Sequence, residues 1–196
     1  MKKKSFLSGA VAVIVLTVLF TACSKNPDMA GDDLVIQGNG ARLNSDAGND
    51  CNFNAVLTDE EIAGLMHMRE EEKVARDVYL KFYEIYGNVI FENIAASEQK
   101  HMEAVLALID GYLLIDPVAG LGVGVFTEKF QEIYNSLIAR GTTLAEAFKV
   151  GVDIEKLDIE DLTKYLSSTE VPNLIKVYNK LLSASEKHLE TFTSLL

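Results

Sequence analysis

The segment from Phe91 to Val105 constrains the fold most strongly, because it places polar and apolar side chains on one helical face. Residues three apart lie on the same side of a helix, and Glu98 and His101 have that spacing. The same face carries these apolar residues around the pair: Phe91, Ile94, Ala95, Met102 and Val105. A carboxylate and an imidazole that face a core are unfavourable unless a partner compensates them. The segment therefore predicts a helix whose Glu-x-x-His pair is half of the ligand set of a di-metal bundle, if other helices supply the remaining ligands. A solvated or salt-bridged helix face is the alternative for this motif alone.

Helical patterns continue from Thr58 to the C-terminus, and no strand alternation persists anywhere in the sequence. Capping residues, glycines and prolines divide this part of the chain into predicted helices. Their expected ranges are Thr58–Gly87, Val89–Leu114, Thr127–Arg140, Thr142 or Thr143 to Ser168, and Pro172 almost to Leu196. Four of these helices are long and one is short. We therefore predict an all-α antiparallel four-helix bundle, with the short extra helix in the central crossover.

Acidic residues at helical spacing recur in the other long segments. Glu72 shares a face with apolar residues of the first helix, and Glu155 and Asp158 are three apart in the fourth. His188 lies in the last helix. A charged, solvated helix surface is the simpler interpretation of any one of these residues taken alone.

Three other polar residues receive different interpretations. Asp161, one helical step beyond Asp158, is a candidate acceptor for the second nitrogen of a ligand imidazole. Glu70 falls on a polar side of the first helix. His67 is about 500° from Glu72 around that helix, at roughly 100° per residue, so we expect a surface histidine that faces elsewhere.

Two sequence phrases resemble the signatures of rubrerythrin-like proteins in the ferritin-like superfamily. The segment Glu72-Lys-Val-Ala-Arg-Asp-Val-Tyr79 is similar to the Glu-x-x-Ala-Arg-x-x-Tyr signature of the first helix. Phe91 to His101 is similar to the next signature, which ends in Glu-x-x-His. The resemblance covers about 140 residues and is closest to an uncharacterised ferritin-like lipoprotein branch, domain of unknown function 2202.

The resemblance implies a ferritin-like bundle with a di-iron carboxylate site, in which Mn or Zn is an alternative metal. Its implied metal ligands are Glu72, Glu98, His101, Glu155, Asp158 and His188. Asp158 is included because the sequence departs from the family pattern at Ser185, where a second Glu-x-x-His would have its Glu. The alternative to such a modified di-metal site is a degraded second position, so that only one ion binds. Dimers are common among relatives, so a homodimer is one expected assembly.

Two functions are compatible with these features. The first is iron or peroxide oxidation of the ferroxidase or rubrerythrin-type peroxidase kind. The second is a non-catalytic envelope lipoprotein that keeps the bundle as an ion- or partner-binding module.

Residues 1–22 resemble a lipoprotein signal peptide. Three lysines precede a mostly apolar run, and the segment Leu19 to Cys23 resembles a lipobox, with lipid expected on Cys23. The apolar run is short for a bilayer span of about 20 residues, and a plain secreted protein is the alternative to a lipoprotein. Residues 23–56 are rich in Gly, Asp, Asn and Ser, which predicts a flexible tether before a domain at 57–196.

These features place the protein in the cell envelope, anchored to a membrane by lipid on its periplasmic or surface side. If Cys23 carries lipid, Cys51 has no partner for an internal disulfide. The formal net charge of −11 gives no basic face for nucleic acid. It fits an acidic soluble surface or a group of carboxylates that binds cations.

Overall fold

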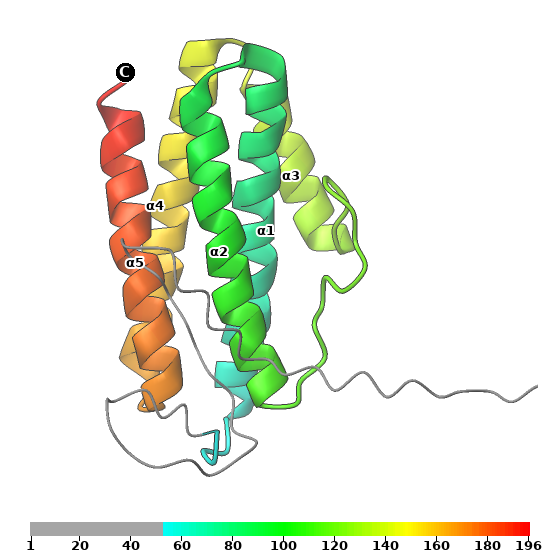
Figure 1. Cartoon of the computed structure of the whole chain (residues 1–196), viewed down its shortest axis with the longest axis vertical. Coiled ribbons are helices and arrows are strands. Elements are labelled where there is room, and N and C mark those ends of the chain that lie inside the picture. The colour runs from blue at the N-terminus through cyan, green and yellow to red at the C-terminus, as the bar shows by residue number, and fades with distance from the viewer. Residues whose placement is uncertain (1–52) are drawn as a thin grey trace, which may run out of the picture.

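The computed structural model describes residues 53–196, which form an antiparallel four-helix bundle with a short extra helix (Figure 1). The helices are α1 (Asp59–Tyr86), α2 (Val89–Gly111), α3 (Glu128–Arg140), α4 (Leu144–Ser168) and α5 (Pro172–Thr193), and the described residues contain no strand. The predicted all-α bundle with its short helix in the crossover is thereby confirmed. The expected signal peptide, Cys23, Cys51 and most of the expected tether lie outside the described residues.

The ends of α1 and α2 follow from local sequence. Thr58 caps α1 through a reciprocal capping box with Glu61, and Gly87 closes the helix with a left-handed φ of 63°. The helix α2 ends at Gly111, three residues before the predicted end, and Leu113 then adopts a φ of 56°. That left-handed backbone conformation cannot continue a right-handed helix.

The order of the helices requires one long connection. As Figure 1 shows, α1 and α5 run in one direction along the bundle, while α2 and α4 run in the other. The chain must therefore return along the bundle between α2 and α4. Residues 112–143 make this return, and α3 packs against the outer side of α1 on the way (Figure 1).

Buried charges on α1 hold this crossover. Lys73 Nζ lies 2.6 Å from Asp77 Oδ2 and donates to the carbonyl of Gly122 at 2.8 Å, while Asp77 also accepts from the backbone N–H of Gly124. Glu70, expected on a polar side, is instead buried and accepts a hydrogen bond from Thr127. That expectation was wrong because the crossover covers the polar face of α1.

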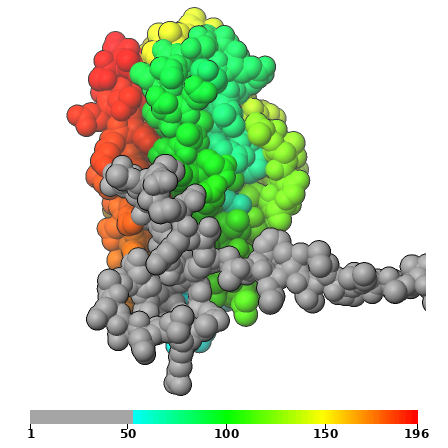
Figure 2. Space-filling model, viewed as in Figure 1, coloured from blue at the N-terminus to red at the C-terminus, as the bar shows by residue number. Residues whose placement is uncertain are grey.

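The apolar core is divided into two parts along the bundle. One part contains Val78, Phe91 and Phe192, and the other contains Leu65, Val105 and Leu181. Each of the four long helices interrupts its apolar stripe between these parts with buried polar residues. In the space-filling view, α2 and α5 close against each other on the visible part of this face (Figure 2). The bundle therefore encloses a polar layer between two apolar layers.

No helix among the described residues combines the length and apolar character needed to cross a bilayer.

Candidate metal centre

The buried polar layer brings five of the six predicted ligands into two overlapping groups. Glu72 comes from α1, Glu98 and His101 from α2, Glu155 from α4 and His188 from α5. All three carboxylate side chains are at most 1% exposed. In each group the donor atoms lie within 4.8 Å of one another.

The first group consists of Glu72, Glu98 and His101. Nδ1 of His101 lies 3.2 Å from Glu72 Oε2 and 2.6 Å from Glu98 Oε2. The pair on α2 faces inward because its residues are three apart on the face that also carries Ile94, Ala95 and Met102 of the core.

The second group consists of Glu98, Glu155 and His188. Nδ1 of His188 lies 2.8 Å from Glu98 Oε1 and 3.5 Å from Glu155 Oε2. The other oxygen of Glu155 accepts a hydrogen bond from the Tyr79 hydroxyl at 2.6 Å. Tyr79 thus fixes the orientation of the Glu155 carboxylate, a contact that the sequence did not predict.

Glu98 belongs to both groups, with one oxygen turned toward each. Each oxygen lies close to an imidazole nitrogen, but neither has a hydrogen bond of regular geometry from a described residue, and both are completely buried. Glu72 Oε1 and His188 Nδ1 are also buried and lack a hydrogen bond of regular geometry. Native proteins rarely leave so many buried polar atoms unpaired in one place. The arrangement is therefore suited to a ligand that takes several of these atoms at once.

Burial and mutual charge shift the pKa values in this layer in opposite directions. Burial raises the pKa of Glu72 and of Glu155 to about 7. Burial would also raise the pKa of Glu98, but the charges of His101 and His188 outweigh it and hold that pKa far below its usual range. One carboxylate thus stays ionised between two imidazoles, while the two outer carboxyls, with pKa values of about 7, titrate near neutral pH.

The same charges act on the two histidines. Burial alone would lower the pKa of His188, but the charge of Glu98 and hydrogen bonding to Glu155 and Glu98 raise it to about 10. Burial is outweighed in the same way at His101, where Glu98 and Glu72 hold the pKa well above its usual range. A bound cation would replace the imidazole protons, because metal ligands must be deprotonated.

Asp158, the sixth predicted ligand, is buried beside these groups but belongs to neither. Its Oδ2 accepts a hydrogen bond from the Ser185 hydroxyl at 2.7 Å, and its Oδ1 has no hydrogen-bond partner among the described residues. Burial, together with the charges of Glu72 and Glu71, raises the pKa of Asp158 well above its usual range. Ser185 thus pairs with the acid that was expected to replace a Glu at its position.

Two further expectations about this region were wrong. Asp161 hydrogen-bonds with His67 at 3.2 Å, and among the described residues it forms no hydrogen bond with His101 or His188. His67 is therefore not a free surface histidine, and its side chain is only 25% exposed. The sequence contained one sign of this position: His67 and Glu71 are four residues apart, and residues with that spacing share a helix face.

Comparisons with known proteins identify relatives of this chain. The crystal structure of the hypothetical protein MJ0754 from Methanococcus jannaschii is similar with a TM-score of 0.71 and 43% identity, over 73% of this chain and 83% of that chain. The uncharacterized protein MJ0754 of Methanocaldococcus jannaschii is 44% identical over 142 residues, which are 71% of this chain and 77% of the relative. The family model described as "Uncharacterized protein domain (DUF2202)" matches residues 61–196. This match and the relative's identity confirm the expected membership, and the chain belongs to the DUF2202 family of uncharacterised protein domains.

Proposed function

We propose that the buried polar layer binds two metal ions as a di-iron carboxylate centre, and that the protein oxidises Fe²⁺ with peroxide or O₂. The observation that carries this proposal is the position of Glu98. Its two buried oxygens face different imidazoles at 2.6 and 2.8 Å, in ion-pair contacts that lack regular hydrogen-bond geometry. A carboxylate with one oxygen beside each of two imidazoles would offer a ligand atom to each of two cations.

The donor atoms fit such a centre. Ferritin-like di-metal proteins use one Glu from each of two helices and one Glu-x-x-His motif from each of the other two. Here Glu72 and Glu155 match the single glutamates, and Glu98 and His101 form one complete motif. The other motif retains His188 but has Ser185 in place of Glu. Five of the six ligands of this general pattern are therefore present. The sixth, a Glu at position 185, is absent, and the buried carboxyl of Asp158 would take its role.

The types of donor atom also limit which metals the centre can bind. Two imidazole nitrogens and three carboxylates suit iron, manganese or zinc. A di-iron centre supplies redox chemistry that can pass electrons from Fe²⁺ to peroxide or O₂. The surrounding residues exclude bulk water by burial, and the hydrogen bond from Tyr79 keeps Glu155 turned toward the centre.

The proposed location follows from the sequence alone. A lipid on Cys23 would anchor the domain to a membrane at the cell envelope, with the segment before residue 57 as a tether. We propose that the protein removes ferrous iron and peroxide there, with metal ions and the membrane lipid as its partners.

Metal analysis combined with an oxidation assay tests the proposal. We expect the purified domain to bind two Fe²⁺ anaerobically in the polar layer, and to oxidise them faster than buffer does when peroxide is added. Glu98→Gln should remove both properties. Glu103→Gln, an exposed residue of α2, makes the same change in charge and should retain them. Equal metal content and equal rates in wild type and Glu98→Gln would refute the proposal.

The pairing of Ser185 with Asp158 favours a second candidate, a module that binds ions without turnover. Asp158 Oδ2 already has a hydrogen-bond donor, so this carboxyl is not an open ligand like Glu98. Iron bound at full stoichiometry but oxidised only at the rate of free Fe²⁺ would identify this second function.

A further inference from the structure

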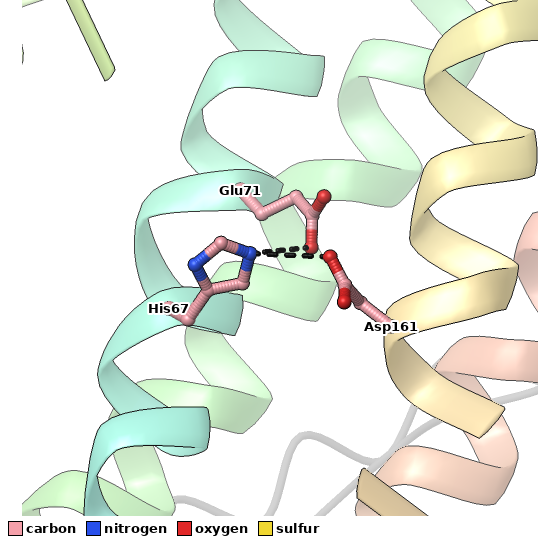
Figure 3. Close-up of side chains that lie close together, drawn as sticks. All are labelled: His67, Glu71 and Asp161. Atoms are coloured by element: carbon pink, nitrogen blue, oxygen red, sulfur yellow. Dashed lines mark hydrogen bonds and ion pairs between the residues drawn. The ribbon is translucent and has the colours of Figure 1, made fainter. Parts of the chain in front are cut away.

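A second cluster of ligand-type side chains lies at the junction of α1 and α4, outside the polar layer described above. It consists of His67, Glu71 and Asp161 (Figure 3). His67 and Glu71 are one helical turn apart on α1, and Asp161 comes from α4. Figure 3 shows the imidazole and both carboxylates pointing toward one another. Their donor atoms lie within 4.8 Å of one another.

We propose that His67, Glu71 and Asp161 form a third metal site, which binds one divalent first-row transition-metal ion independently of the buried layer. One imidazole nitrogen and two carboxylate oxygens are the donor types that such ions take in proteins. The site goes beyond the proposed di-iron function, because it shares no ligand with it.

The distances agree with ligands arranged around a single ion. Nε2 of His67 lies 3.2 Å from Asp161 Oδ2 and 3.7 Å from Glu71 Oε2. With metal–ligand distances of about 2.1 Å, neighbouring ligands are about 3.0 Å apart in octahedral and about 3.4 Å apart in tetrahedral geometry. Only small side-chain movements would therefore bring these donor atoms to the spacing of ligands around one ion.

The state of Glu71 provides an independent indication of a ligand. Its side chain is 8% exposed, yet Oε2, the oxygen turned toward His67, has no hydrogen-bond partner among the described residues. Lys129 of α3 is close enough to attract Glu71 electrostatically, but its Nζ lies over the ring of Phe130 at 5.5 Å. A buried carboxylate oxygen without a donor is unfavourable, and a cation between the three side chains would satisfy it.

The cluster is also accessible, unlike the buried layer. The side chains of His67 and Asp161 are 25% and 18% exposed, so water can complete the coordination of an ion. The ring of Phe130 lies 5.3 Å from the imidazole and limits its movement on one side. A competing explanation is that a protonated His67 alone neutralises the two carboxylates, and the experiment must separate these cases.

The number of Zn²⁺ ions bound at neutral pH, counted by equilibrium dialysis, distinguishes a metal site from a cluster neutralised by His67 alone. We expect wild type to bind one more ion than His67→Gln and one more than Asp161→Asn. Glu160→Gln, an exposed neighbour with a matched change in charge, should bind as many ions as wild type. Circular dichroism establishes that each variant is folded. Equal ion counts in wild type, His67→Gln and Asp161→Asn would overturn the proposal and leave the protonated imidazole as the explanation.

The Glu98→Gln background distinguishes this site from the di-iron centre. We expect Glu98→Gln to keep one Zn²⁺, and the double variant Glu98→Gln/His67→Gln to keep none. If Glu98→Gln binds as many ions as wild type while His67→Gln loses one, the di-iron centre fails and the third site stands. If Glu98→Gln retains no ion, the third site is refuted. Should Glu98→Gln not fold, the comparison of wild type with His67→Gln decides alone.

Discussion

The metal-free protein should lose stability as the pH rises from 5 to 8, because the polar layer binds protons more tightly when folded. The pKa values of Glu72 and Glu155 rise from 4.5 to about 7 on folding. A raised folded-state pKa gives stability that is fully present below the unfolded value and lost as the pH passes through the folded value. The loss therefore falls between pH 4.5 and 7.

The size of the effect follows from the pKa shifts. Each unit corresponds to about 1.4 kcal/mol, so about two units between pH 5 and 7 amount to about 3 kcal/mol for each carboxyl. His188, with its pKa raised from 6.5 to about 10, adds a loss of the same sign above pH 6.5. The lowered pKa of Glu98 acts in the opposite sense, but only below 4.5. The total of several kcal/mol is comparable to the whole stability of a typical domain, about 5–15 kcal/mol.

Urea unfolding of chelator-treated protein, followed by circular dichroism, measures this loss. With a slope of about 2 kcal/mol per molar urea, the midpoint should be about 3 to 4 M lower at pH 8 than at pH 5. The double variant Glu72→Gln/Glu155→Gln controls for general repulsion in an acidic protein and should show a much smaller decrease. A wild-type midpoint that stays constant or rises over this range would refute the reasoning.

Three other changes have defined outcomes. Asp77→Ala removes the carboxylate paired with the buried Lys73 and should lower the unfolding free energy by about 3 kcal/mol, measured by urea unfolding. Tyr79→Phe removes the hydrogen bond to Glu155 and should weaken metal binding by about tenfold or more, measured by competition with a chelating dye. Cys23→Ser should leave an unprocessed, unlipidated precursor, and palmitate labelling that persists in this variant would contradict the lipoprotein prediction.

The fold was predictable from the sequence because its determinants are local. Apolar spacing defines the four long helices, and Thr58 and Gly87 mark the ends of α1 through their own capping geometry. The position of Glu98 and His101 on one face was also local, since it depends only on helical periodicity. These two residues could therefore be assigned to the interior before the other helices were placed.

The errors concern contacts between helices. His67 was judged by its angle from Glu72, but its partners are Glu71 on the same face and Asp161 on α4. An angle measured from one ligand cannot show which other helix lies opposite a residue. Glu70 was misplaced for a similar reason, because the path of the crossover over α1 has no local signature in the sequence.

Ser185 makes the two halves of the polar layer unequal. Glu72 and Glu155 occupy matching places opposite Glu98, and a further buried carboxyl of α4, Asp158, faces Ser185 of α5. Burial and the neighbouring carboxylates raise its pKa, which favours its neutral form and limits the repulsion among carboxylates enclosed between two apolar parts of the core. A cation entering beside His188 would favour the ionised form, and Asp158 Oδ1 then has no other hydrogen-bond donor to satisfy it. The charge of Asp158, which pairs with Ser185 between α4 and α5, would therefore depend on a bound ion.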